Sequence, residues 1–255
     1  MVGELIGQYR LEEELVRGTY GGVFRAVHIH MDTIQGAVKR VDPSLAKDPS
    51  FVTAIRQECM LLDGLNHPGI VGFKTLDVTE DRIAILLELL EGRDLFQVTQ
   101  SGPMAVAEVE RIARAILEAL SYAHIKKVVH RDIKPSNAFL CNDGTVKLMD
   151  FGVSRAADGT KASQTGQIVG TFDYMAPEAF DGRVTPAVDV YAVGLVIWEL
   201  LTGRVACPEG SLARKMRWHI GEELSDVRAL RPDCPPWLAI LIRHLVEKEE
   251  ASRPA

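Results

Sequence analysis

The sequence predicts an α+β protein in which a small, strand-rich N-terminal part precedes a larger helical part. In the first 90 residues, short apolar runs are separated by glycines, which is typical of antiparallel strands joined by turns. Beyond them, long stretches carry apolar residues at helical spacing. The character of the chain changes near residues 88–93, so we expect a boundary there and an active site in the cleft between the two parts.

Before this boundary, the pattern predicts four strands and one main helix. The helix covers residues 51–65, where apolar side chains recur every three or four positions. Gly64 and Pro68 are its stop signals. The strands are expected at residues 9–16, 23–30, 36–41 and 82–90.

After the boundary, the clearest element is a long apolar helix that Thr185 and Pro186 open and Gly203 ends. A capping hydroxyl, a proline at the first helical position and a glycine just past the end all agree. Residues 214–219 and 247–250 carry many charges, and we expect both as solvated helical surface, with partner binding as the alternative for the basic segment 214–219. Two more helices are expected at 106–124 and 237–247, and two short strands at 138–141 and 146–149.

Composition excludes several classes of protein. The 255 residues are 47% hydrophobic and 25% charged, which argues against disorder, a collagen-like chain and a disulfide scaffold. A net charge of −6 provides no basic field for nucleic acid. The four cysteines form no CxxC pair and are expected as reduced thiols. No apolar run reaches the roughly 18 residues of a membrane span, and no signal peptide is visible. We therefore expect a cytoplasmic protein with no nucleic-acid partner and no membrane segment.

One short loop, residues 130–137 with the sequence HRDIKPSN, combines an acid, a cation and an amide. The carboxylate of Asp132 can orient a hydroxyl nucleophile and accept its proton. Lys134 can balance phosphate charge beside it, and Asn137 offers an amide oxygen to a hard cation. Asp150, at the end of a predicted strand, is a second candidate ligand for Mg²⁺. This loop is the predicted catalytic centre.

With these motifs the chain resembles a eukaryotic-like protein kinase domain over essentially its whole length. The segments 146–152 and 228–233 make it most similar to the bacterial Ser/Thr protein kinases. The resemblance implies a bilobal fold, with an N-lobe at 1–87, a hinge at 88–93 and a C-lobe at 94–255 whose last helix is cut short. It implies ATP and Mg²⁺ or Mn²⁺ as cofactors and protein Ser/Thr hydroxyls as acceptors. It also implies that the chain is the cytoplasmic kinase part of a longer, membrane-anchored protein, or a cytoplasmic protein by itself.

The resemblance assigns a glycine-rich phosphate loop to residues 16–23. Its second and third glycines are Gly18 and Gly21, but Val16 stands where the family has the first glycine. Since glycines let backbone N–H groups approach phosphates closely, we expect altered nucleotide binding rather than its loss. The other nucleotide-facing residues of this loop are Arg17, Thr19, Tyr20 and Val23.

The resemblance assigns further nucleotide-binding residues beyond the loop. Lys39 would bind the α- and β-phosphates, and Glu58 on the predicted helix would hold that lysine by an ion pair. Phe139 is bulkier than the aliphatic residue that the family usually places under adenine. The complete set adds Val23 and Ala37 against the adenine ring, Leu87 behind it, the backbones of Glu88 and Leu90 at its edge, and Asp94 at the ribose.

Regulation is implied by Arg131, which in the family often pairs with a phosphate on the activation segment. The polar loop 158–167 offers three hydroxyls for autophosphorylation, in which a homodimer would act in trans. Thr171 would contact the catalytic loop near Asp132. The candidate phosphosites are Thr160, Ser163 and Thr165, of which Thr165 is preferred because it lies nearest the anchor at 170–171.

Two structural contacts are also implied by the resemblance. Glu178 would form an ion pair with Arg253 near the end of the chain. Asp189, at the head of the apolar helix, would brace the backbone of His130 and Arg131, and a charged residue in so apolar a helix otherwise has little reason to be there.

Three readings compete. An active Ser/Thr protein kinase is favoured by Lys134, two positions after Asp132, since the tyrosine-specific branch of the family usually has another pattern there. A pseudokinase that scaffolds or binds nucleotide is suggested by Val16 and Phe139. Pseudokinases usually lack the strand lysine, the catalytic aspartate or the metal aspartate, and this chain retains all three. A small-molecule kinase of the aminoglycoside or choline type would lack a segment like 171–178.

Overall fold

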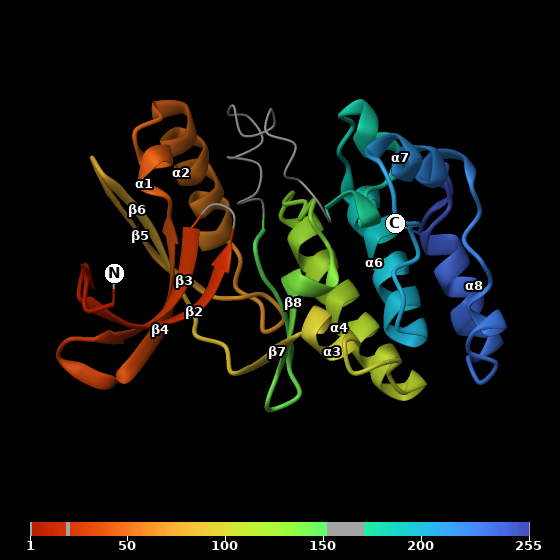
Figure 1. Ribbon diagram of the computed structural model, residues 1–255, viewed down its shortest axis with the longest axis horizontal. Coiled ribbons are helices and arrows are strands. Elements are labelled where there is room, and N and C mark those ends of the chain that lie inside the picture. The colour runs from red at the N-terminus through yellow and green to blue at the C-terminus, as the bar shows by residue number, and fades with distance from the viewer. Residues whose placement is uncertain (1, 19–20, 152–170, 255) are drawn as a thin grey trace. The chain divides into compact units, whose positions relative to one another are not determined.

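The computed structural model describes residues 2–18, 21–151 and 171–254 (Figure 1). These residues form two compact units. The N-terminal unit comprises residues 2–91, and the C-terminal unit comprises residues 92–151 and 171–254.

The N-terminal unit is built on a six-stranded antiparallel sheet of order β1-β2-β3-β4-β6-β5. Two helices, α1 (Pro43–Ala46) and α2 (Pro49–Asp63), lie between β4 and β5 in sequence. The strands are β1 (Leu5–Ile6), β2 (Tyr9–Gly18), β3 (Gly21–His28), β4 (Met31–Val41), β5 (Phe73–Thr79) and β6 (Arg82–Leu87).

Alternation along the strands gives this unit two small cores, because successive strand side chains point to opposite faces. Ile83 and Ile85 pack with Phe51, Ile55 and Cys59 of α2. On the other face, Leu11, Phe24, Val38 and Leu86 pack together. The start of α2 is set by Asp48, whose carboxylate accepts the Ser50 N–H at 2.9 Å, with Pro49 at the first helical position.

The predicted strands all exist, but their ends differ. The strand expected at 36–41 begins at Met31, and the one expected at 82–90 ends at Leu87. Strand β5 was not predicted, because it lies at the sheet edge and its side chains are half-buried or exposed, so it lacks a strong apolar signal. Helix α1 is a single turn capped by Asp42, too short for any periodicity.

The C-terminal unit is mainly helical. Its small antiparallel sheet has the order β7-β8-β9. The helices are α3 (Leu95–Thr99), α4 (Val106–Ile125), α6 (Pro186–Thr202), α7 (Leu212–Gly221) and α8 (Pro236–Leu245), and the strands are β7 (Gly92–Asp94), β8 (Ala138–Cys141) and β9 (Val146–Leu148). Short 3-10 turns occur at Pro135–Asn137, Thr171–Tyr174, Pro177–Asp181, Val227–Ala229 and Glu250–Ser252.

Helix α6 is the centre of this unit, and α4 and α8 pack against it. Nearly every side chain of α6 is buried, as expected for a helix that is apolar on all sides. Its predicted ends are confirmed: the Thr185 hydroxyl accepts the Ala187 N–H at 3.3 Å, and Gly203 ends the helix with φ of 68°. Among the helices in the described ranges, none is both long and apolar enough to cross a bilayer.

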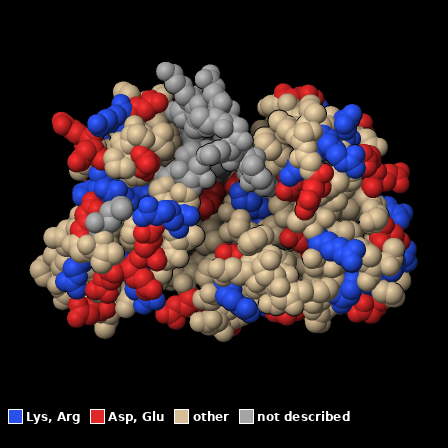
Figure 2. Space-filling model, in the orientation of Figure 1, with Lys and Arg blue, Asp and Glu red and all other residues tan. Residues whose placement is uncertain are grey.

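The prediction of solvated surface at 214–219 and 247–250 was wrong in part. Trp218 and His219 are buried at the end of α7. The Lys248 ammonium lies 5.0 Å from the Trp218 ring centroid and 5.6 Å from that of Tyr191. A run of charged residues in the sequence does not show which of them are buried. Here the aliphatic part of the Lys248 side chain packs against an aromatic cluster. On the face shown in Figure 2, Lys and Arg side chains are interspersed with Asp and Glu on both units.

Acid should destabilise the protein through His219. Its ring is fully buried, with Nδ1 2.9 Å from the Tyr191 hydroxyl, and burial followed by repulsion from Lys248 lowers its pKa from 6.5 to about 3. The His219 ring therefore takes up a proton near pH 6.5 in the unfolded chain but only near pH 3 in the folded chain. The stability that is present above pH 6.5 is lost as pH falls toward 3. At pH 4.5, two units below 6.5, this costs roughly 3 kcal/mol.

The measurement is urea unfolding at pH 7 and pH 4.5 for the native chain and for His219→Asn, which removes the titrating ring. Carboxylate effects cancel in the comparison between the two proteins. The native chain should lose more stability on acidification than the variant, and equal losses would contradict the assignment.

Candidate active site

The loop 130–137 is held by a single buried carboxylate. Asp189, near the start of α6, accepts the backbone N–H of His130 at 2.8 Å and that of Arg131 at 2.7 Å. Its Oδ2 also lies 2.8 Å from Nε2 of His124 at the end of α4. The predicted brace is confirmed, and it ties the loop to two helices of the C-terminal unit.

Two residues at this site adopt the left-handed backbone conformation, which is unfavourable for residues that carry a side chain. Arg131 has φ of 71° and Asp150 has φ of 59°. For a residue other than glycine this conformation costs about 1–2 kcal/mol, so it persists only where surrounding contacts hold it. The charge-assisted hydrogen bond from Arg131 N–H to Asp189 is one such contact.

His130 connects the loop to the end of β9. It is fully buried, and its Nε2 lies 2.8 Å from the Met149 carbonyl while its Nδ1 accepts the Asp132 N–H at 3.3 Å. A carbonyl only accepts and an amide N–H only donates, so the ring is neutral with its hydrogen on Nε2. Burial, which lowers the pKa of His130, agrees with this neutral form. The ring also lies 4.4 Å from that of Phe151, centroid to centroid, so it supports the residues on both sides of Asp150.

The three predicted catalytic residues lie together. Oδ2 of Asp132 accepts the Lys134 ammonium at 2.8 Å and the Asn137 amide at 2.8 Å. The Asn137 Nδ2 also donates to the Asp132 carbonyl at 2.7 Å. One carboxylate oxygen is therefore engaged by two donors, which leaves Oδ1 as the oxygen that can accept from an incoming hydroxyl.

The two predicted metal ligands flank the β8–β9 hairpin: Asn137 directly precedes β8, and Asp150 lies two residues after the end of β9. Both amide hydrogens of Asn137 are directed at Asp132, so its amide oxygen is the atom that can ligate a cation. The Asn137 carbonyl accepts the Met149 N–H at 2.8 Å, which places Asp150 one residue beyond this contact. An amide oxygen and a carboxylate fit a hard cation. In residues 2–18, 21–151 and 171–254 no three His, Cys, Asp or Glu side chains form a metal-binding group, and Mg²⁺ completed by substrate phosphates needs only one or two carboxylates.

In the N-terminal unit, sheet register puts the predicted nucleotide residues on one face. Val23 lies opposite Lys39, and Ala37 lies opposite Leu87. Since directly opposed residues share a face, as do residues two apart, all four side chains belong to the face that carries α2. Glu58 is on the buried side of α2 and is 9% exposed. Lys39 and Glu58 therefore face the same layer between sheet and helix.

In the predicted phosphate loop, position 21 must be glycine, whereas position 18 has room for a side chain. Gly21 has φ of 140°, and a Cβ there would lie 1.9 Å from the Arg40 carbonyl oxygen on β4. A Cβ on Gly18 would meet nothing closer than 3.7 Å. Val16 pairs with Val23 in the β2–β3 ladder, where a side chain is tolerated, and it is 58% exposed. Arg17 lies opposite Gly22 and donates to Glu14 at 2.6 and 2.9 Å, while Thr19 and Tyr20 lie outside the described residues.

The predicted hinge residues have structural partners of their own. The Glu88 N–H donates to the Gly72 carbonyl at 2.7 Å, and its Oε2 accepts the Gly72 N–H at 3.1 Å. Leu90 lies past the end of β6, outside any strand or helix. In the C-terminal unit, Asp94 caps α3 by accepting the Gln97 N–H at 2.7 Å and lies opposite Phe139 in the β7–β8 pair.

Comparison with known proteins identifies the family. The model of the family described as "Protein kinase domain" matches residues 9–255. The chain belongs to the protein kinase family. The predicted α+β kinase fold, with a small antiparallel-sheet N-terminal part, one main helix and a larger helical C-terminal part, is confirmed.

Bacterial serine/threonine-protein kinases are among the relatives of this kinase domain. The kinase PrkC of Bacillus subtilis is 31% identical over 256 residues, covering 99% of this chain and 39% of the relative. The probable kinase SCO3848 of Streptomyces coelicolor is 36% identical, covering 94% and 37%. A crystal structure of the Mycobacterium tuberculosis PknI kinase domain matches with a TM-score of 0.76 at 25% identity, covering 99% of this chain and 92% of that one. The kinase domain spans about two fifths of the length of the curated relatives.

The predicted ion pair between Glu178 and Arg253 is confirmed within this kinase domain. Two parallel hydrogen bonds of 2.5 and 2.9 Å join the carboxylate to the guanidinium, and both side chains are buried. Arg253 also donates to the backbone carbonyls of Glu247, Ala187 and Lys248. The guanidinium thus joins the turn at 177–181, the start of α6 and the end of the described chain.

Sequence reasoning missed two contacts of the kinase's segment 171–174. The Lys215 ammonium of α7 forms an ion pair with Asp173. The Tyr174 hydroxyl donates to Glu199 of α6 at 2.5 Å, and burial raises the pKa of that carboxyl. The signal for Glu199 was available, since it is a second acid inside an apolar helix, like Asp189. Of the predicted regulatory residues, Thr171 opens this 3-10 turn, whereas Thr160, Ser163 and Thr165 lie outside the described residues.

Proposed function

We propose that this chain is an active Ser/Thr protein kinase that transfers the γ-phosphate of ATP to a Ser or Thr hydroxyl of a protein. The observation that carries the proposal is the Asp132 carboxylate, held at 2.8 Å by both Lys134 and Asn137 on a loop that Asp189 braces. A rigidly held acceptor beside a cation suits a reaction that depends on placement and charge neutralisation.

The chemistry assigned to the C-terminal unit starts with Oδ1 of Asp132, which accepts the proton of the substrate hydroxyl. The hydroxyl oxygen forms a bond to the γ-phosphorus while the bond from that phosphorus to the bridging oxygen of ADP breaks. The Lys134 ammonium offsets the charge on the transferred group. Asn137 and Asp150 would hold Mg²⁺, which supplies charge neutralisation on the phosphates when it is bound.

The N-terminal unit is assigned to the nucleotide. Lys39 would bind the phosphates and Glu58 would orient the lysine, which their shared layer between sheet and α2 supports. Gly21, which must be glycine because a Cβ there would meet the Arg40 carbonyl, stands where the family has the third glycine of its phosphate loop. Val16 is exposed and replaces only the first of the three glycines, so we expect altered rather than absent ATP affinity.

The deciding experiment is incubation with radiolabelled ATP, Mg²⁺ and a generic protein substrate, beside the Asp132→Asn variant. Label transferred by the native chain but not by the variant is expected. ATP binding without transfer by the native chain would instead favour the pseudokinase alternative, which the departures from the family pattern at Val16 and Phe139 suggest.

Asp150→Ala should weaken binding of Mg²⁺-ATP at least tenfold while the fold persists, because a carboxylate that holds the metal is lost (a tenfold loss is about 1.4 kcal/mol). Isothermal titration calorimetry with and without Mg²⁺ measures it. The matched control is Asp143→Asn, an exposed acid in the β8–β9 turn whose carboxylate accepts the Thr145 N–H. Unchanged affinity for Mg²⁺-ATP in the Asp150 variant would remove it from the metal site.

The proposal includes autophosphorylation at Thr160, Ser163 or Thr165, with Thr165 preferred, in trans within a transient homodimer. A phosphate there would pair with Arg131 and raise activity. Mass spectrometry of the chain after incubation with ATP, beside the Asp132→Asn variant, tests it. Phosphate is expected on this segment in the native chain only, and equal activity of the triple alanine variant would refute the regulatory role.

A further inference from the structure

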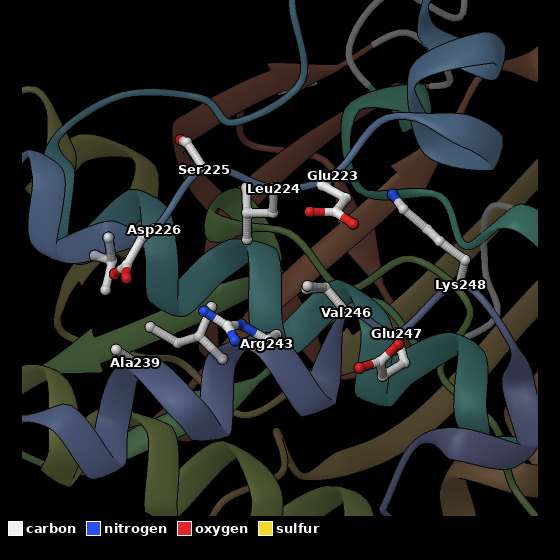
Figure 3. A pocket seen from close by; sticks show the side chains of 11 residues that line it. Glu223, Leu224, Ser225, Asp226, Ala239, Arg243, Val246, Glu247 and Lys248 are labelled. Atoms are coloured by element: carbon white, nitrogen blue, oxygen red, sulfur yellow. The ribbon is translucent and has the colours of Figure 1, made fainter.

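A hollow of about 570 Å³ lies in the C-terminal unit, between the segment that follows α7 and one side of α8 (Figure 3). Its rim carries two acids, Glu223 and Glu247, and two cations, Arg243 and Lys248. Since these charges balance, they select no particular ligand. A contact with a clearer chemical direction lies in the N-terminal unit, where β6 ends at Leu87.

Glu88 is the first residue after β6, and it contacts Gly72, the last residue before β5, in two ways. The backbone N–H of Glu88 donates to the Gly72 carbonyl at 2.7 Å. The Gly72 N–H in turn donates to Oε2 of the Glu88 carboxylate at 3.1 Å. Both residues are half-buried and belong to the N-terminal unit. The contact extends the β5–β6 pair by one position beyond Phe73 and Leu87, which lie opposite each other.

The acceptor of the second bond is a side chain where a ladder uses backbone. In an antiparallel ladder, two hydrogen-bonded residues that lie opposite each other exchange both N–H···O=C bonds. Between Glu88 and Gly72 the first of these bonds is made, but the second ends on the Glu88 carboxylate and not on the Glu88 carbonyl. The backbone therefore turns between the N–H and the C=O of Glu88, and this carbonyl leaves the ladder.

The chain leaves the sheet at the same position on its other side, because pairing of β6 with β4 ends with Leu87 opposite Ala37. The half-buried Gly72 N–H needs an acceptor, as buried backbone groups do. Glu88 offers two candidates, its carbonyl and its carboxylate. Because the carboxylate accepts this N–H, the carbonyl is directed elsewhere. Loss of the carboxylate would return the carbonyl to Gly72 and restore the regular pair.

We propose that the Glu88 side chain is a positioning residue for the adenine base of ATP. By accepting the Gly72 N–H, it holds the Glu88 carbonyl out of the ladder, where this carbonyl accepts the exocyclic amine of adenine. The inference rests on the ATP binding of the proposed function and adds the group that decides base specificity. Inosine has a carbonyl in place of that amine, so ITP would bring an acceptor against an acceptor. The Glu88 carboxylate thereby makes the site select adenine over hypoxanthine.

The test is binding of ATP and of ITP, each with Mg²⁺, to the full chain by calorimetry. The native chain should prefer ATP at least tenfold. Glu88→Ala should weaken ATP binding about tenfold, or about 1.4 kcal/mol, and keep the Kd for ITP within about twofold. Glu88→Asp keeps the charge but is one methylene too short, so it should lose the same affinity. Glu88→Gln keeps an oxygen acceptor at the same reach and should retain the preference for ATP.

The matched control is Glu80→Ala, which makes the same change at the exposed turn between β5 and β6 and should keep both Kd values within about twofold. Circular dichroism checks that each variant is folded, and the Asp variant decides the matter if the Ala variant is not. Equal weakening of ATP and ITP binding by Glu88→Ala would indicate general damage to the unit and overturn the proposal.

Three further results would also overturn it: no preference for ATP in the native chain, an unchanged preference in Glu88→Ala and Glu88→Asp, or a loss in Glu88→Gln as large as in Glu88→Ala. The last of these would show that the charge matters and the accepted N–H does not. None of these titrations depends on phosphoryl transfer. A native chain that prefers ATP but transfers no phosphate would therefore refute the proposed catalysis alone.

Discussion

Replacing Asp132 with asparagine is expected to lower kcat at least about a hundredfold while nucleotide affinity stays near normal. Asparagine keeps the size of the side chain and an oxygen for the donors of Lys134 and Asn137, so the loop should retain its shape. It removes the negative charge and the basic oxygen that accepts the substrate proton. Steady-state phosphorylation of a protein substrate, together with ATP titration by calorimetry, measures both quantities.

The control for this prediction is Asp143→Asn, which makes the same chemical change at an exposed turn of the same unit. Its activity should stay within about twofold of the native value, as for ordinary surface substitutions. Activity of the Asp132 variant within threefold of the native chain would exclude Asp132 as the catalytic base. A hundredfold loss that is accompanied by a matching loss of ATP affinity would instead indicate damage to nucleotide binding.

Glu178→Gln is expected to destabilise the C-terminal unit by about 3–5 kcal/mol, because it leaves the buried Arg253 guanidinium without its counter-ion. Both side chains of the native pair are nearly inaccessible, at 0% and 2% exposure, so water cannot replace the lost charge. The three backbone carbonyls that Arg253 also contacts hold the guanidinium in place and prevent its escape to solvent. Urea unfolding followed by circular dichroism measures the change.

The comparison for this variant is Asp226→Asn, which breaks the ion pair with Arg228 at the surface. Those side chains are 34% and 44% exposed, and an ion pair so exposed to water and salt contributes little to stability. A loss of stability for Glu178→Gln no larger than that for Asp226→Asn would show that the buried pair is not a stabilising contact. The contrast tests burial, since both substitutions neutralise one carboxylate of an Arg–acid pair.

Local patterns were sufficient for many features of this kinase domain. The ends of α6 follow from Thr185, Pro186 and Gly203 alone, because capping and the left-handed φ of glycine act within a few residues. The catalytic loop was recognisable because chemistry demands an acid, a cation and an amide within eight positions. The contacts of Asp189 and of Glu178 with Arg253 were predicted from the resemblance to protein kinases, and for Asp189 a charge in so apolar a helix also needs a partner.

Other features depended on residues far apart in the chain. Nothing near Gly21 in sequence shows that the Arg40 carbonyl would occupy the space of a Cβ, because that contact arises only when β3 and β4 pair. Lys248 and Trp218 are separated by thirty positions, and α7 and the end of the chain must pack before the lysine stem is enclosed. The sequence by itself therefore determined the elements, their caps and the set of chemical groups. Tertiary packing alone decided which of those groups are desolvated and which remain unpaired at a surface, because burial and charge pairing are properties of the assembled chain.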